Sequence, residues 1–299
     1  MKLMNNQKIM IKEVGPRDGL QNEKEIISSK QKIQWINYLS ETGLSYIEIT
    51  SFVPRNWIPQ LSDAKEVARG IERKKGVTYA ALVPNLIGLE AALESNMDEI
   101  NIFMSASETH NQKNINKTIT NTYPILKSVA IEALKAGKTV RGYISTVFGC
   151  PYEGEVNIKS VLEACDHLLQ YGVNEISLGD TIGIANPVSV EKTLTEIGKH
   201  FDRSHFALHF HDTRGMALAN ILRSLDLGYT TFDSSLGGLG GCPYAPGASG
   251  NVATDDLVHM LNNMGYSTGI SEEKLRVAAV FIQNRIRKSL RSHQMKMTK

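Results

Sequence analysis

The sequence has 299 residues, of which 41% are hydrophobic and 21% charged, and its formal net charge is +2. This composition is typical of a globular protein, and so small a net charge provides no strong basic field for nucleic acid. No segment resembles a membrane span or a signal peptide, and three scattered cysteines do not make a disulfide framework, so we expect a cytoplasmic protein that binds neither membranes nor nucleic acid.

Short β-rich runs alternate with longer amphipathic segments along almost the whole chain. The predicted strands are Ile9–Val14, Tyr46–Thr50, Thr78–Leu82, Glu99–Phe103, Thr139–Thr146, Glu175–Leu178, His205–Phe210 and Thr231–Ser234. Apolar residues recur at helical spacing in Ser28–Glu41 and in Ser160–Tyr171. Asn186 followed by Pro187 is typical of a helix start, because asparagine caps the first turn and proline suits its first position.

Eight strand–helix units in succession indicate parallel strands joined by right-handed crossovers. Closing such strands into a ring removes both exposed sheet edges. We therefore predict an α/β fold, a (β/α)₈ TIM barrel over about residues 8–265, within one catalytic domain of 299 residues. The alternative is an open doubly wound sheet, which usually has a glycine-rich phosphate turn after its first strand. Here that position reads GPRDG (15–19).

An additional helix is expected after the eighth unit. In Ser271–Arg291, apolar side chains from Leu275 to Leu290 fall at helical spacing. This C-terminal helix packs either on the barrel rim or on a second subunit, and the sequence alone does not choose between them.

Polar residues stand where several predicted strands end, which is where barrel enzymes carry their catalytic groups. Asp18 is a hard oxygen ligand for a divalent cation, although an isolated aspartate is equally typical of a turn. His209 and His211 point to one face of their strand, either as a pair of metal ligands or as two ordinary core histidines. Asn251, after a glycine-rich loop that begins at Gly237, adds a neutral oxygen. Together these four residues favour Mg²⁺ or Mn²⁺ over a structural zinc.

Further candidates are suited to catalysis. Glu48 alternates with isoleucines and should point into the barrel, where its charge needs a partner such as Arg17. Asp180 closes the sixth strand, where it can hold a histidine or accept a substrate hydroxyl. Cys242 lies between Gly241 and a proline, so we expect an exposed thiol that acts as an acid or nucleophile, or is merely incidental.

These motifs resemble those of the 3-hydroxy-3-methylglutaryl-CoA (HMG-CoA) lyases, in the superfamily of metal-dependent lyase and synthase barrels. The resemblance covers about residues 9–265, and it is carried by EVGPRDGLQNE (13–23), SFVPR (51–55), SLGDTIG (177–183), HFHDTRG (209–215) and the loop of Cys242. It implies an acyl-CoA substrate, a divalent cation and a homodimer.

The resemblance also implies roles for individual residues. The implied metal ligands are Asp18, His209, His211 and Asn251. The implied catalytic residues are Arg17, Glu48, Asp180, Cys242 and His209. The implied substrate contacts are Arg17, Gln21 and Ser51. Lys113, Asn114 and Asn116, in the loop expected after the fourth strand, either contact CoA or belong to a solvated loop. Asp255 stands where relatives carry glutamate, so the shorter side chain keeps the charge with less reach.

The implied reaction is a retro-Claisen cleavage of HMG-CoA to acetyl-CoA and acetoacetate, the chemistry of leucine degradation and ketone-body formation. Asp180 or His209 takes the proton of the tertiary hydroxyl, Arg17 stabilises the enolate oxygen, and Cys242 protonates the enolate carbon. Two alternatives remain. One is a related acyl-CoA/α-keto acid synthase or 4-hydroxy-2-oxo acid aldolase on the same scaffold. The other is a non-catalytic barrel that binds a CoA ester.

Overall fold

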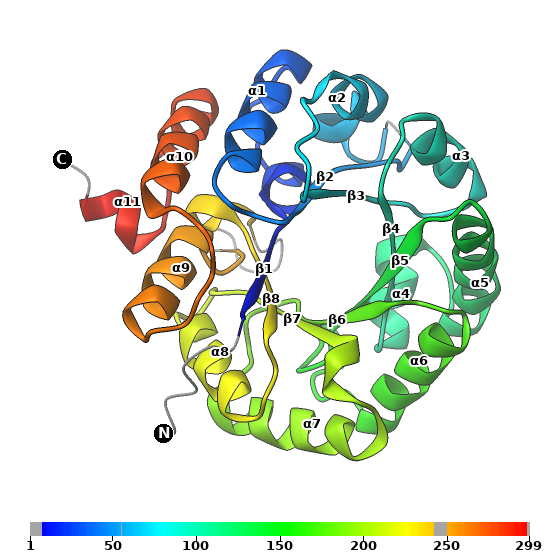
Figure 1. Cartoon of the computed structure of the whole chain (residues 1–299). Coiled ribbons are helices and arrows are strands. Elements are labelled where there is room, and N and C mark those ends of the chain that lie inside the picture. The colour runs from blue at the N-terminus through cyan, green and yellow to red at the C-terminus, as the bar shows by residue number, and fades with distance from the viewer. Residues whose placement is uncertain (1–7, 55, 242–249, 298–299) are drawn as a thin grey trace.

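The computed structural model describes residues 8–54, 56–241 and 250–297 (Figure 1). Eight parallel strands form a closed barrel in chain order, and β1 pairs with β8 to complete the ring. The strands are β1 Met10–Glu13, β2 Tyr46–Ser51, β3 Thr78–Leu82, β4 Glu99–Ser105, β5 Thr139–Ser145, β6 Glu175–Asp180, β7 Phe206–Phe210 and β8 Thr231–Ser234. The predicted (β/α)₈ barrel is confirmed, and the strand ends differ from the predicted ones by at most two residues.

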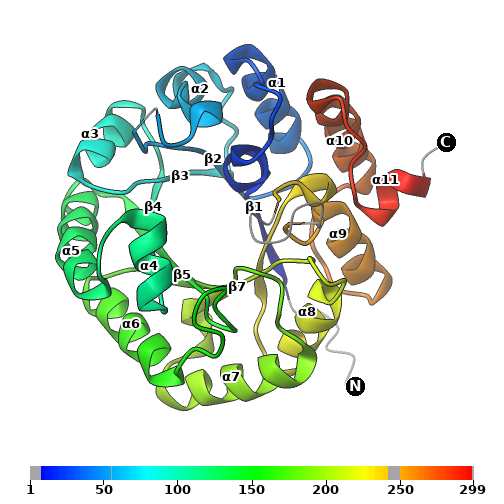
Figure 2. The same cartoon turned by 180° about the vertical axis from the view of Figure 1, so that it is seen from behind.

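Helices surround the barrel, most of them in an outer ring (Figures 1 and 2). They are α1 Ser29–Ser40, α2 Ala64–Gly70, α3 Leu86–Glu94, α4 Glu108–Ile115, α5 Ile119–Lys135, α6 Ile158–Gln170, α7 Pro187–His200, α8 Ala217–Asp226, α9 Thr254–Asn263, α10 Glu272–Ile286 and α11 His293–Met297. Short helical turns add η1 Gly15–Gly19, η2 Pro59–Leu61, η3 Arg203–His205 and η4 Leu236–Gly238. None of these described helices has the length and apolarity needed to cross a lipid bilayer.

The helix starts follow from capping side chains. Ser28 precedes α1 and forms a capping box with Gln31, and Asn186 forms one with Ser189 before α7. Pro187 occupies the first turn of α7, as expected from the sequence. These contacts satisfy backbone N–H groups that otherwise lack a partner within the helix.

The segment after β4 is a helix rather than the expected loop. Ser107 caps α4, its Oγ accepting a hydrogen bond from the backbone N–H of His110 at 3.1 Å, and the helix ends at Asn116 in the left-handed conformation. The sequence of α4, ETHNQKNI, has a single apolar residue and so lacks the period on which helix prediction rests. In both views α4 lies nearer the barrel axis than α5, which occupies the outer ring.

The C-terminal helix packs on its own barrel. α10 packs against α1 and α9 (Figure 1), and its Leu275, Ala278 and Ile282 belong to the same hydrophobic core as the barrel. The helix ends one turn earlier than expected, because Arg287 adopts a positive φ of 53°. Of the two expected partners, the rim of its own barrel and a second subunit, the apolar face of α10 therefore packs on the rim.

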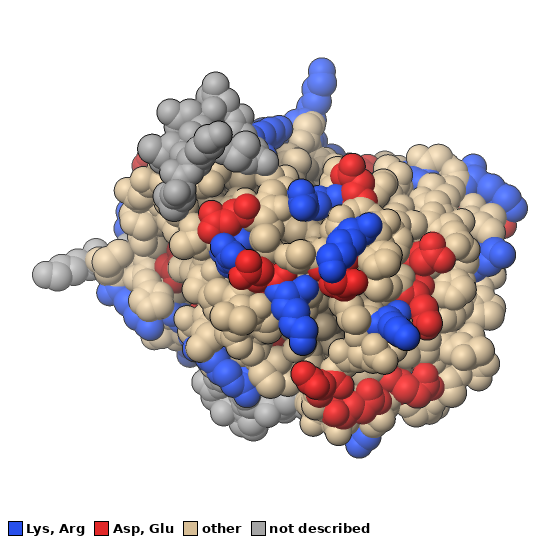
Figure 3. Space-filling model, turned by 90° about the horizontal axis from the view of Figure 1, so that it is seen from below, with Lys and Arg blue, Asp and Glu red and all other residues tan. Residues whose placement is uncertain are grey.

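The barrel interior contains ion pairs. Arg141 on β5 is fully buried, and its guanidinium lies 2.6 Å from a carboxylate oxygen of Asp233 on β8 and 2.6 Å from one of Glu175 on β6. Lys12 on β1 also contacts Glu175, at 2.8 Å. Buried charges are tolerated only when paired in this way. On the face of the molecule seen in Figure 3, by contrast, charged side chains of both signs lie at the surface.

Candidate active site

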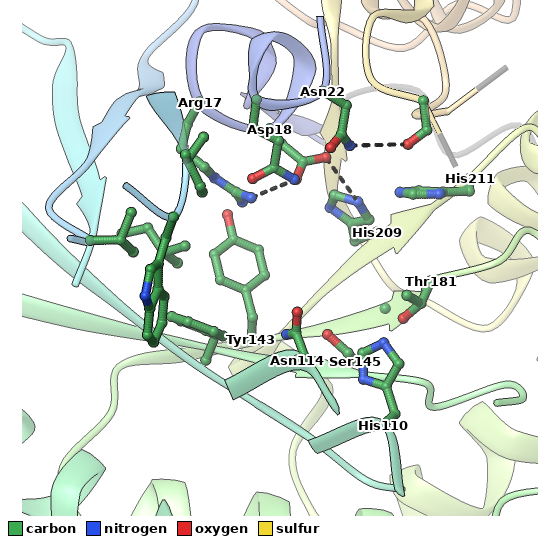
Figure 4. A pocket seen from close by; sticks show the side chains of 18 of the residues that line it. Arg17, Asp18, Asn22, His110, Asn114, Tyr143, Ser145, Thr181, His209 and His211 are labelled. Atoms are coloured by element: carbon green, nitrogen blue, oxygen red, sulfur yellow. Dashed lines mark hydrogen bonds and ion pairs between the residues drawn. The ribbon is translucent and has the colours of Figure 1, made fainter. Parts of the chain in front are cut away.

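A pocket opens at the carboxyl ends of the strands, and predicted site residues line it (Figure 4). The predicted residues in its lining are Arg17, Asp18, Gln21, Asn114, His209 and His211. The sequence did not single out Tyr143 and Trp57, which also line it. Residues from η1, α4, β5 and the β7 end thus share one cavity, as expected for the catalytic face of a barrel.

The four predicted metal ligands converge in this pocket. Asp18, His209 and His211 each offer a ligand atom, and these atoms all lie within 4.8 Å of one another. The backbones of Asn251 and His211 pair in an isolated antiparallel β-bridge. The side-chain amide Nδ2 of Asn251 lies 2.7 Å from Asp18 Oδ2. Segments 233 residues apart in the chain therefore meet at one carboxylate.

The protonation states of this cluster suit a cation. Burial and, to a smaller extent, the neighbouring His209 together lower the pKa of His211 to about 4, so the imidazole is neutral at physiological pH. Burial would raise the pKa of Asp18, but Arg17 and the two histidines outweigh it and hold the pKa below its usual value. Metal ligands bind in these forms, a neutral imidazole and an ionised carboxylate. His211 Nδ1 is buried without a hydrogen-bond partner among the described residues, so the donor set fits a divalent cation.

Arg17 is held beside the cluster by two carboxylates. Its Nε donates to Glu48 Oε2 at 2.6 Å and its Nη1 to Asp18 Oδ1 at 2.5 Å, which confirms the predicted pairing with Glu48. The guanidinium also lies 5.2 Å from the ring centroid of Tyr143. Both carboxylates raise the pKa of Arg17 against the effect of burial, so its charge is permanent.

Glu48 is fully buried and is supported by neutral donors as well. Asn101 Nδ2 donates to Glu48 Oε1 at 2.7 Å, and the Tyr143 hydroxyl donates to Oε2 at 3.1 Å. Tyr143 lies on β5, in a strand where inward and outward positions alternate. This alternation could have indicated that Tyr143 points into the barrel. Nothing in the sequence indicated that its partner there is Glu48.

Within the part of the chain that the structure describes, Asp233, which the sequence did not single out, contacts a histidine, and Asp180 does not. Of the two expected roles of Asp180, the contact with a histidine is not formed among the described residues, because its carboxylate oxygens accept the backbone N–H groups of Ile184 and Ala185, at 2.9 and 3.1 Å. The other role, accepting a substrate hydroxyl, stays a prediction. Asp233 holds the histidine instead, with Oδ2 3.2 Å from His209 Nδ1. Burial raises the pKa of Asp180 to about 6. Its neighbours in the chain, residues 179 and 181, line the pocket.

The remaining predicted residues are placed as follows. Gln21 Nε2 donates to Asp18 Oδ1 at 2.9 Å. Ser51 is buried and is not among the residues that line the pocket. Its hydroxyl donates to the backbone oxygen of Leu82 at 3.3 Å. Lys113 lies over the ring of Tyr152, 4.4 Å from its centroid. Cys242 lies outside the described residues.

Two buried carboxylates anchor the chain that follows β8. Glu13 Oε1 accepts the backbone N–H groups of Gly15 and Leu236, at 2.8 and 3.0 Å, and Oε2 accepts the hydroxyl of Thr254 at 2.6 Å. Asp255 Oδ1 accepts the N–H of Gly237 at 3.0 Å, so the shorter side chain at this position reaches the backbone of η4. The two carboxylates therefore position the segment that leads towards Gly241 at the pocket.

Substituting Glu13 with glutamine should change the pH dependence of stability. Burial raises the pKa of Glu13 to about 7, so the folded state binds this proton more tightly than the unfolded state. Glu13 therefore contributes most to folding stability at low pH, and this contribution to stability is lost as pH rises from about 4.5 to about 7. The amide keeps the Oε1 acceptor without that titration, so the Tm of Glu13→Gln relative to wild type should rise across this window in thermal melts. If plots of Tm against pH ran parallel for wild type and Glu13→Gln, they would contradict a buried carboxyl that titrates in this window.

Comparison with known proteins identifies the family. The HMGL-like family model matches residues 8–282. The chain belongs to the HMGL-like family. A Bacillus subtilis relative named hydroxymethylglutaryl-CoA lyase is 57% identical over 98% of both chains, and a rat relative named 3-hydroxy-3-methylglutaryl-CoA lyase, cytoplasmic, is 48% identical over 95% of this chain and 83% of its own.

Solved structures of the family have the same fold. The crystal structure of the Bacillus subtilis HMG-CoA lyase superposes with a TM-score of 0.97, at 57% identity and with 98% of both chains covered. An Acinetobacter baumannii HMG-CoA lyase in complex with coenzyme A and 3-methylmalate has a TM-score of 0.93 at 39% identity, covering 98% of this chain and 95% of its own. The resemblance expected from the motifs is therefore confirmed over nearly the whole chain.

Proposed function

We propose that this chain is a divalent-metal-dependent carbon–carbon lyase that cleaves (S)-HMG-CoA to acetyl-CoA and acetoacetate. The observation that carries the proposal is the convergence of Asp18, His209 and His211 beside Arg17 at the open end of the barrel. The 57% identity to a protein named hydroxymethylglutaryl-CoA lyase supports the choice of substrate.

Asp18, His209, His211 and Asn251 are the proposed metal ligands, and this mixed oxygen and nitrogen set favours Mg²⁺ or Mn²⁺. Asn251 now presents its NH₂ group to Asp18, and a half turn of the amide presents Oδ1 instead. When bound, the cation supplies the Lewis acidity that makes the tertiary hydroxyl of the substrate easier to deprotonate.

Arg17 is proposed to bind the thioester oxygen as it becomes an enolate. A guanidinium has five N–H donors, of which the contacts to Glu48 and Asp18 account for two. The carboxylates and the Tyr143 ring fix its orientation before substrate arrives, so little reorganisation is needed when charge develops. A preorganised donor of this kind is worth about 3 kcal/mol or more in the transition state.

The proton transfers are assigned to two further groups. His209 lines the pocket, but it is proposed to use one ring nitrogen for the cation, and the other contacts Asp233. Asp180, whose pKa is raised to about 6, is better suited to accept the hydroxyl proton near neutral pH. We propose Cys242 as the acid that protonates the enolate carbon. It follows Gly241 in the chain, which lines the pocket.

The other expectations from the sequence are kept as proposals. Gln21 and Asn114 line the pocket and are proposed to contact the substrate, whereas a role for Ser51 would require its hydroxyl to leave Leu82. The barrel and α10 share one hydrophobic core, which supports a single catalytic domain. The homodimer and the cytoplasmic location remain predictions.

The alternatives predict different products. A synthase consumes acetyl-CoA with an α-keto acid, an aldolase cleaves a 4-hydroxy-2-oxo acid, and a non-catalytic barrel binds a CoA ester without turnover. The high identity to proteins named HMG-CoA lyase argues against all three. A non-catalytic barrel would also have no reason to keep buried, paired charges inside the barrel.

Incubating the purified protein with HMG-CoA should release acetoacetate and acetyl-CoA in equal amounts. The rate should fall to background after chelation and return on adding Mg²⁺ or Mn²⁺, because the proposed chemistry needs the cation. Acetoacetate is measured with a coupled dehydrogenase assay, and acetyl-CoA by chromatography. Unchanged turnover in a metal-stripped sample, or turnover of the synthase or aldolase substrates alone, would contradict the proposal.

A further inference from the structure

Asp233 stands at the centre of a buried polar network beneath the proposed metal site. Its side chain is completely excluded from solvent. Oδ1 lies 2.6 Å from Arg141 Nη2, and Oδ2 accepts the hydroxyl of Ser177 at 2.7 Å and faces His209 Nδ1 at 3.2 Å. Arg141 holds the pKa of this carboxyl well below its usual range, despite burial.

We propose that Asp233 is a positioning residue that fixes the tautomer of His209, and that Arg141 sets the direction in which Asp233 acts. The inference rests on the proposed function, because the tautomer matters only if His209 binds a cation. An ionised carboxylate can only accept hydrogen bonds, so neutral His209 carries its proton on Nδ1. The lone pair is then on Nε2, the nitrogen 3.9 Å from Asp18 Oδ2.

Support of this kind is a general requirement of metal-binding histidines. The ring nitrogen that does not bind the metal usually donates to a carboxylate or a carbonyl, which fixes the orientation of the ring and raises its basicity. Here the carboxylate comes from the neighbouring strand, since His209 pairs with Asp233 in the register of β7 and β8. The backbone of the barrel therefore fixes the separation of the two side chains.

Arg141 makes the Asp233→Asn substitution informative. The new amide has one oxygen and one NH₂ group. A buried guanidinium requires an acceptor, so the oxygen should face Arg141 and the NH₂ group should face His209. His209 Nδ1 must then accept, which moves its proton to Nε2 and removes the lone pair that a cation needs. A nearly isosteric change is therefore expected to switch the histidine to the wrong tautomer.

Glu175→Gln is the matched control. Glu175 also contacts Arg141, at 2.6 Å, so the control removes one carboxylate charge from the same buried network. Glu175 has no contact with His209 among the described residues. A general effect of weakening the buried network should appear in both variants, whereas an effect through the tautomer of His209 should appear in Asp233→Asn alone.

The experiment measures Mn²⁺ affinity and the His209 tautomer. Asp233→Asn should raise the Kd for Mn²⁺, measured by electron paramagnetic resonance, by about 10- to 100-fold, while Glu175→Gln stays close to wild type. In ¹⁵N-histidine spectra of the metal-free protein at pH 8, His209 should carry its proton on Nδ1 in wild type and Glu175→Gln, and on Nε2 in Asp233→Asn. The His209→Gln spectrum assigns the signal.

The outcomes separate this inference from the proposed function. If wild type binds Mn²⁺ and a folded Asp233→Asn variant binds it equally well, the tautomer inference is overturned while the metal site stands. A wild-type His209 protonated on Nε2 would overturn it even if the variant did not fold. If wild type binds no Mn²⁺, the proposed metal site is wrong and the inference fails with it.

Discussion

Replacing Arg17 with methionine should lower kcat for HMG-CoA cleavage by about two to three orders of magnitude. Methionine fills a similar volume but provides no donor for the enolate oxygen. Because the lost interaction strengthens only in the transition state, kcat and kcat/KM should fall together. Steady-state kinetics at saturating Mn²⁺ measures both. A loss of only a few-fold would contradict the enolate role.

The same substitution should also destabilise the protein, and a second variant separates the two effects. Arg17→Met leaves Glu48 buried with only the neutral donors Asn101 and Tyr143, and an uncompensated buried charge costs about 3–5 kcal/mol. The double variant Arg17→Met/Glu48→Gln removes that charge, so its free energy of unfolding should recover while its turnover stays low. Recovery of turnover with stability would show that Arg17 acts only through folding.

Replacing His211 with alanine should weaken Mn²⁺ binding by about 100-fold or more, since loss of even a supporting contact to a metal ligand costs about 10- to 100-fold. Activity at low Mn²⁺ should be lost with the ion and partly recovered at high concentration. Stability should change little, because His211 Nδ1 has no hydrogen-bond partner among the described residues. Titration with Mn²⁺ gives the Kd, and denaturant unfolding gives the stability.

His110→Ala is the control for this measurement. His110 lines the same pocket, on the side formed by α4 (Figure 4), and it is not part of the Asp18 cluster. Its removal should leave the Kd for Mn²⁺ unchanged, whatever it does to substrate binding. Equal Kd values for wild type and His211→Ala would remove His211 from the ligand set.

The fold and the metal cluster were predictable because their signals are local. Each strand stands out as a short β-rich run, and the order of strands and helices leaves few closed arrangements. In a parallel barrel all strands end on one face, so polar residues at strand ends must be neighbours even when far apart in sequence. Asp18, His209, His211 and Asn251 meet for this reason.

The supporting network was not predictable, because its pairs depend on contacts across the barrel. Arg141 and Asp233 are separated by 92 residues and lie on β5 and β8, which are not adjacent. A sequence pattern shows that a side chain points inward, but not which inward side chain it meets. The position of Asp180 at a strand end predicts only that it holds a histidine or accepts a hydroxyl, whereas the residue that contacts a histidine is Asp233, within β8.

The ionic interior also limits how this protein can diverge. Neutralising Arg141 alone leaves the carboxylate of Asp233 buried without its cation, and neutralising Asp233 alone leaves Arg141 with Glu175 as its one remaining carboxylate. Exchanging both Arg141 and Asp233 for apolar side chains of similar size need not be harmful to folding. Drift at these positions should thus proceed by coordinated replacements. Among distant homologues, the guanidinium of β5 and the carboxylate of β8 are expected to disappear together.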